Sequence, residues 1–235
     1  VFGHDSMGME TALPHISETR NQFGIEITRL DMKLLSDMLI KKSYDERELL
    51  KLKKWIKSDC LKIEIPKETD EHNLDKSLAL YLIVRDMMKE LNAVGGGFMS
   101  QLEWGSDSRG IPLPVADIME SLFNSTFDHN GPKEVIPYAT EADVQALLTQ
   151  LFMTWLSGGN PPLFMDFRKV WEPNEIKEFA KQNNVKLSGK SIWEKKGFVD
   201  GVNSGSASFD WAALPGSLHN EILGKISFPK AVEYF

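Results

Sequence analysis

Residues 135–152 read VIPYATEADVQALLTQLF, and this stretch indicates a change from strand to helix. Its first five residues form a short apolar run of the kind that a buried strand has. From Val144 to Phe152 the apolar residues recur at helical spacing, and Thr140 is a candidate N-cap for this helix. Glu141 therefore lies in an acidic turn directly after a predicted strand.

A second acidic residue follows a similar pattern downstream. The segment SGGNPP at residues 157–162 stops the helix, and residues 163–165 are predicted to form a second buried strand that ends at Asp166. In open α/β sheets, ligands bind outside the carboxyl ends of the strands. Two carboxylates brought to that edge could hold one hard cation or share acid–base work. Acidic residues also occur at helix starts simply because they complement the helix dipole, so both interpretations stay open.

The rest of the chain alternates between strand-like and helix-like patterns, which favours a parallel sheet with helices on both faces. Strands are predicted at residues 25–30, 94–99 and 196–202, and helices at 32–40, 74–91, 115–123 and 173–182, with N-caps at Asp31 and Ser43. We predict an α/β, Rossmann-like three-layer domain with a mainly parallel sheet over residues 1–157. Residues 158–235 are predicted to begin a second, β-containing domain.

Composition limits the possible classes of protein. The chain has 235 residues, of which 42% are hydrophobic and 26% charged, as in ordinary soluble proteins. Its net charge of -7 argues against a nucleic-acid partner. The apolar stretches are too short and too interrupted to span a bilayer, and the lone Cys60 cannot form an internal disulfide. We expect a cytoplasmic protein with no nucleic-acid or membrane partner.

Several segments, in order along the chain, resemble the L-fucose isomerase family. The two that surround the acidic residues, ATEAD at 139–143 and FMDFRKVW at 164–171, are similar to that family's metal-binding segments. Further matching stretches are SMGM at 6–9, YDE at 44–46, RDMM at 85–88, NSTFDHNG at 124–131, NSGSA at 203–207 and the region from His219 to Phe235.

The resemblance implies an aldose–ketose isomerase that interconverts L-fucose and L-fuculose, or a similar sugar pair, through a metal-stabilised cis-enediol. It implies that Glu141 and Asp166 are both catalytic residues and ligands of Mn²⁺, or of Mg²⁺. The family's third ligand, a histidine, has no match in this chain. By the same resemblance Met7 and Ser204 contact the sugar, although each also fits an ordinary turn. The family also has a glutamine near the position of Met99. Here Gln101, two positions further on, is the candidate for that contact with the sugar.

The resemblance also implies partners and a larger whole. The expected partner is a small-molecule sugar, and the expected assembly is a homohexamer. The chain is interpreted as an internal piece of a longer protein, a fragment without activity of its own. The alternative is a non-catalytic or regulatory carbohydrate-binding relative of the same fold, which the departure near Met99 favours.

Overall fold

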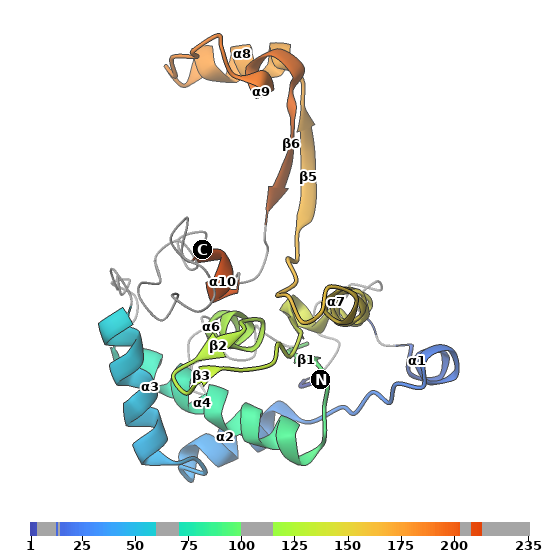
Figure 1. The fold of residues 1–235 in the computed structure, drawn as a ribbon, viewed down its shortest axis with the longest axis vertical. Coiled ribbons are helices and arrows are strands. Elements are labelled where there is room, and N and C mark those ends of the chain that lie inside the picture. Colours follow the sequence, from blue (N-terminus) through green and yellow to red (C-terminus); the bar gives the residue numbers. More distant parts are fainter. Residues whose placement is uncertain (4–12, 14, 60–70, 100–114, 203–207, 213–235) are drawn as a thin grey trace. The chain divides into compact units, whose positions relative to one another are not determined.

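The computed structural model describes residues 1–3, 13, 15–59, 71–99, 115–202 and 208–212 (Figure 1). Contacts between residues divide the chain into two units, Val1–Phe164 with Gly205–Phe235, and Met165–Ser204. The elements of the first unit are α1 (Ile16–Phe23), α2 (Met32–Ile40), α3 (Glu46–Asp59), α4 (Glu71–Glu90), β1 (Gly96–Gly97), α6 (Val115–Phe123), β2 (Phe127–Asp128), β3 (Gly131–Pro132), β4 (Tyr138–Ala139), η2 (Thr140–Ala142), α7 (Val144–Leu156) and α10 (Phe209–Ala212). Those of the second are β5 (Asp166–Trp171), α8 (Pro173–Gln182), α9 (Ile192–Lys196) and β6 (Phe198–Val202).

A small parallel sheet organises the first unit. Strand β1 pairs in parallel with β4, and Phe2 forms parallel bridges to Leu30 on one side and to Phe98 on the other. The order across the sheet is therefore Leu30, Phe2, β1 with Phe98, and β4. The main-chain nitrogens of Phe2 and Met99 complete the ladder, at 2.9 Å from Gly97 O and 2.7 Å from Phe2 O.

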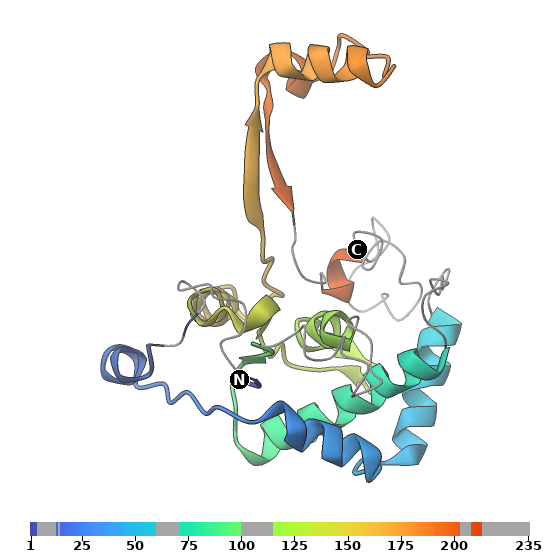
Figure 2. The same ribbon diagram turned by 180° about the vertical axis from the view of Figure 1, so that it is seen from behind.

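Helices cover both faces of this sheet. Two neighbouring glycines identify the helix on each face, because consecutive positions of a strand face opposite sides. A Cβ at Gly96 would approach Met88 of α4, at 3.3 Å from its Cε, whereas a Cβ at Gly95 would lie 3.1 Å from Leu147 Cδ1 of α7. Helix α4 therefore lies on one face and α7 on the other, as Figures 1 and 2 also show.

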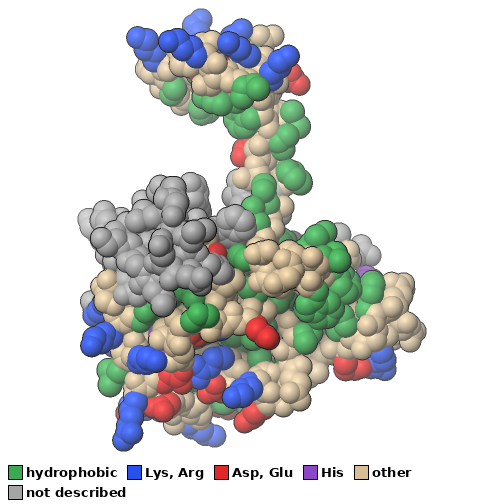
Figure 3. Space-filling view, viewed as in Figure 1, with side chains coloured by type: hydrophobic (Ala, Val, Ile, Leu, Met, Phe, Trp, Pro, Cys, Tyr) green, Lys and Arg blue, Asp and Glu red, His purple; other side chains and the backbone are tan. Residues whose placement is uncertain are grey.

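The hydrophobic core lies on the α4 face. Residues 78–84 of α4 are all buried, because α2, α3 and α6 pack around this helix. Phe123 of α6 stacks on Tyr138 of β4 with ring centroids 4.9 Å apart, which joins the helices to the sheet. By contrast, the outer surface of α7 exposes Met153, Trp155 and Leu156, and Figure 3 shows hydrophobic side chains gathered there. Every helix in the described part of the chain is too short or too polar to cross a lipid bilayer.

The second unit is an antiparallel hairpin with two helices. Strands β5 and β6 pair from Asp166↔Val202 to Trp171↔Phe198, and the Trp171 ring stacks on Phe198. Helix α8 begins with Pro173 at its first position, as the sequence predicts, and buries Ile176 and Ala180.

The sequence predicted the helices better than the strands. Helices at 32–40, 115–123 and 173–182 are confirmed, as is the N-cap Asp31, whose carboxylate accepts from the Lys33 amide at 2.7 Å. The cap predicted at Ser43 was wrong, because Asp45 accepts from the Arg47 amide at 2.7 Å. Of the strand predicted at 25–30, only Leu30 bridges to a neighbour.

The predicted strand at residues 163–165 was wrong. These residues form no strand, and Leu163 and Met165 are 48% and 39% exposed. Asp166 begins β5 instead of ending a buried strand, because β5 pairs with β6, more than 25 residues further on, and not with the parallel sheet. The described structure is thus a mixed α/β fold with a small parallel sheet.

Candidate functional site

Glu141 lies in a tight turn that the structure holds in an unfavourable conformation. Strand β4 ends at Ala139, and residues 140–142 form the 3₁₀ turn η2. Inside it Glu141 has φ 55° and ψ 17°, and Ala142 has φ 46°, both in the left-handed region. That region costs an L-residue other than glycine about 1–2 kcal/mol. Such conformations persist only where the surroundings hold them, and they concentrate at functional sites.

The turn packs against a position where only glycine fits. A Cβ on Gly97 of β1 would lie 2.6 Å from Ala139 O and 2.7 Å from Ala142 Cα, which are both main-chain atoms. The missing side chain therefore allows the turn to approach β1 closely. After the turn, Asp143 caps α7 by accepting from the Ala146 amide at 2.9 Å. The prediction of Thr140 as this cap was wrong.

Thr140 instead donates a hydrogen bond to a carboxylate that the sequence analysis did not single out, that of Glu120. Its Oγ1 donates to Glu120 Oε2 at 2.8 Å, and Glu120 of α6 is only 1% exposed. The available signal was weak, because Glu120 is one of two acidic residues, with Asp117, inside the largely apolar helix at residues 115–123. Beside it, the hydroxyl of the buried Tyr138 has no hydrogen-bond partner within the described residues. Burial first, and then the charge of Glu120, raise the pKa of Tyr138 well above its usual value.

The turn stands at the carboxyl edge of the parallel sheet. The chain leaves the sheet at this edge after Gly3, after Met99 and after Ala139. Because Phe2 lies between Leu30 and Phe98, the connections on either side of it run in opposite directions across the sheet. In open α/β sheets, ligands bind at such a reversal, outside the carboxyl ends of the strands.

The structure describes the predicted site residues unequally. Glu141 is half-buried in the first unit. Asp166 is the first residue of β5 in the second unit, with its main chain opposite Val202. Met7, Gln101 and Ser204 lie outside the described residues. Within the described residues, no three histidine, cysteine or acidic side chains are grouped as a metal site would require.

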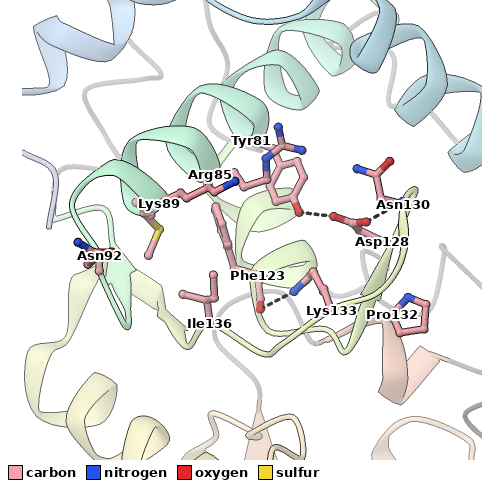
Figure 4. Close-up of a pocket in the computed structure, with 12 residues that line it drawn as sticks. Tyr81, Arg85, Lys89, Asn92, Phe123, Asp128, Asn130, Pro132, Lys133 and Ile136 are labelled. Atoms are coloured by element: carbon pink, nitrogen blue, oxygen red, sulfur yellow. Dashed lines mark hydrogen bonds between the residues drawn. The ribbon is translucent and has the colours of Figure 1, made fainter.

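A hollow of about 480 Å³ lies at the opposite edge of the sheet (Figure 4). Its lining includes Ala93 and Ile136, which precede β1 and β4, so it lies toward the amino ends of these strands. Apart from the exposed Lys89, the charged side chains that line it are already paired within the protein. Lys133 Nζ donates to Phe123 O at 3.0 Å, and Asp128 accepts from the Tyr81 hydroxyl at 2.9 Å.

Arg85, which also lines this hollow, makes a two-bonded ion pair with Glu48, with Nη2 2.8 Å from Oε2. This pairing lowers the pKa of Glu48 to about 2. The hollow is therefore surrounded by groups that stabilise the fold, and the turn around Glu141 is the better candidate site.

These features define an α/β protein with an acidic, strained turn at the carboxyl edge of its parallel sheet. Comparison with known proteins gives the family. Residues 1–158 match the family described as "L-fucose isomerase, second N-terminal domain". The chain therefore belongs to the L-fucose isomerase family, as its sequence motifs predict.

Individual relatives agree with this assignment. The chain is 28% identical over 241 residues to the L-fucose isomerase of Clostridium perfringens, covering 90% of this chain and 38% of that protein. It is 29% identical over 233 residues to the L-fucose isomerase of Salmonella choleraesuis, covering 89% of this chain and 37% of that protein. The L-fucose isomerase of Salmonella typhimurium gives the same identity and coverage. The chain thus spans less than two fifths of the length of these relatives.

Proposed function

We propose that the whole protein is an aldose–ketose isomerase that acts on L-fucose or a similar aldose. The observation that supports it most is the strained, glycine-backed turn that carries Glu141 at the carboxyl edge, in a chain of the L-fucose isomerase family. The strand order, with helices on both faces, supports a Rossmann-like three-layer arrangement for this domain.

The reaction moves one proton between neighbouring carbons. A carboxylate takes the proton from C2 of the open-chain aldose while O1 gains a proton, which gives a cis-enediol. The proton then returns to C1 while O2 loses its own, which gives the ketose. We assign the transfer of the carbon-bound proton to Glu141 and Asp166, because a positioned carboxylate can act as the base in such a transfer.

Carboxylate oxygens also fit a hard divalent cation, and Glu141 and Asp166 would hold Mn²⁺ or Mg²⁺ with further ligands from outside this chain. When bound, the ion supplies positive charge that stabilises negative charge on the sugar oxygens. Met7, Gln101 and Ser204 are proposed to contact the sugar. A cytoplasmic homohexamer, and the lack of turnover by these 235 residues alone, stay predictions.

Ketose formation by the whole protein with Mn²⁺ tests the proposal. Glu141→Gln and Asp166→Asn should each lower kcat by about 10²–10⁴-fold, since each removes a base without changing side-chain size. Both should also slow exchange of the C2 proton of the aldose with deuterated water. Glu134→Gln is the matched control, because Glu134 is exposed and lies before β4. Near-normal turnover by both variants would show that these are not the catalytic carboxylates.

The same assay distinguishes the alternative function. A non-catalytic carbohydrate-binding relative would bind L-fucose without turnover or C2 exchange in the unaltered protein. One structural observation favours this alternative. Met99, near the position where the family has a glutamine, is 3% exposed at the end of the sheet ladder. A buried methionine offers a sugar no hydrogen-bond donor and only a weak sulfur acceptor.

A further inference from the structure

Helix α6 carries an acidic residue that is fully buried. Glu120 is 1% exposed, and its helix neighbours Met119 and Leu122 are fully buried. Burial of a carboxylate costs free energy unless hydrogen bonds and charges compensate it. An apolar residue at this position would pack without that cost, so what Glu120 contacts is informative.

Glu120 contacts the candidate site through one residue. Its Oε2 accepts the hydroxyl hydrogen of Thr140 at 2.8 Å, and Thr140 is 6% exposed and directly precedes Glu141. The carbonyl of Thr140 in turn accepts from the Asp143 amide at 3.1 Å, which closes the turn. Within the described residues, the carboxylate of Glu120 and the left-handed backbone at Glu141 are thus joined through the buried Thr140.

The side chain of the residue directly after α6 holds the strand that leads into this turn. Asn124, one helical turn after Glu120, donates from Nδ2 to Tyr138 O at 2.9 Å and accepts from the Tyr138 amide at 3.0 Å. Both contacts are buried, so water does not compete for them. Helix α6 therefore holds β4 through Asn124 and the turn through Glu120.

We propose that Glu120 is a positioning residue that, through Thr140, holds the strained turn carrying Glu141 in the conformation that the site needs. The catalytic part of this inference rests on the proposed isomerase function. Glu120 itself need not touch sugar or metal. Its carboxylate accepts the Thr140 hydrogen bond that water would otherwise accept, and so keeps residues 140–142 in the strained conformation.

Substitution of Thr140 tests the link with little change of shape. Thr140→Val removes the hydroxyl donor, whereas Thr140→Ser keeps it. The control is Thr154→Val, because Thr154 is also buried but its hydroxyl has no hydrogen-bond partner within the described part of the chain. All three are made in the whole protein and compared by amide hydrogen exchange, by calorimetric titration with Mn²⁺, and by kcat and KM.

We expect Thr140→Val to exchange the Asp143 amide about tenfold faster and to bind Mn²⁺ about tenfold more weakly, the usual cost of losing a group that orients a ligand. Its kcat should fall about tenfold or more, with KM changed by less than about twofold. Thr140→Ser should recover these values to within about threefold. Glu120→Gln should disturb the turn less than Thr140→Val, because the amide oxygen still accepts the hydrogen bond.

The readouts separate the two proposals. If the unaltered protein shows no turnover, the isomerase function fails, and amide exchange and Mn²⁺ affinity still decide the role of Glu120. If Thr140→Val exchanges the Asp143 amide at the unaltered rate, the positioning role is overturned. The same holds if Thr140→Val only loses stability, as Thr154→Val would, while kcat and Mn²⁺ affinity stay unchanged.

Discussion

Gly97 shapes the candidate site through the side chain that it lacks. The turn after β4 can lie against β1 only because no Cβ stands between Gly97 and the main chain of Ala139 and Ala142. The position of Glu141 in a turn after a strand could be predicted from sequence alone, since an acidic residue directly after a strand-like run is a local pattern. Gly97 and Glu120 were not, because their roles depend on residues about 45 and 20 positions away.

Substitution of Gly97 by alanine should therefore destabilise the protein strongly. The added Cβ would meet two main-chain atoms at 2.6 and 2.7 Å, which cannot rotate away as a side chain can. We expect Gly97→Ala to lower the free energy of unfolding by about 2–4 kcal/mol, measured by urea denaturation.

Gly24→Ala is the control for this substitution. Gly24 has φ 67° with nothing within 4 Å of its added Cβ, so this change introduces backbone strain without a collision. It should cost about 1 kcal/mol. Equal losses for the two variants would contradict the close approach of the turn to β1.

At the scale of elements, local patterns predicted the helices and failed where distant partners decide. Asp31 and Pro173 act within their own helices, and both were predicted correctly. Thr140 has the right residue type for a helix cap, but Glu120 accepts its hydroxyl hydrogen, so Asp143 takes that role. Strand β5 needs β6 as its partner, and a short apolar run before Asp166 gave no sign of that pairing.

The joint between α6 and β4 gives a prediction at this scale. Asn124 satisfies both main-chain groups of Tyr138, a residue that is 1% exposed. Asn124→Leu would leave a buried N–H and a buried C=O without these partners, so we expect a loss of about 2–3 kcal/mol in the free energy of unfolding. Thermal or urea denaturation measures it.

Asn183→Leu is the matched control, because Asn183 is exposed and its side chain makes one hydrogen bond, to Phe179 O at 2.9 Å. It should cost less than about 0.5 kcal/mol. A small loss for Asn124→Leu as well would show that water replaces its contacts and that α6 does not hold β4.

At the scale of the whole first unit, an ionic cluster joins elements that are distant in sequence. Glu48 of α3 pairs with Arg85 of α4 and accepts from Asn130 Nδ2 in the β2–β3 turn at 2.9 Å. The buried His129 ring also lies 3.1 Å from Glu48 through Nε2. Glu48 thus joins α3 to two other segments, α4 and the β2–β3 turn, and no local sequence pattern predicts these contacts.

This cluster predicts how stability depends on pH. Arg85 first, and then Asn130 and His129, hold the pKa of Glu48 at about 2, against 4.5 for an ordinary glutamate. Because the folded-state pKa is lowered, the contribution of Glu48 is complete above pH 4.5 and is lost as pH falls from 4.5 toward 2. The loss should be about 2 kcal/mol, less than the full shift would give, since the pair is partly solvated.

Glu48→Gln should remove this acid sensitivity while lowering stability at neutral pH, because Arg85 then loses one of its two charged partners and keeps only Asp86. Urea denaturation near neutral pH and at about pH 3 should therefore give a large difference between variant and unaltered protein in the first condition and a small one in the second. Glu46→Gln is the control, since Glu46 pairs with Lys42 on an open surface where both side chains are more than 60% exposed. Its effect should stay below about 1 kcal/mol at both values. A Glu48→Gln difference that persists undiminished in acid would mean that the carboxylate acts through shape and not through its charge.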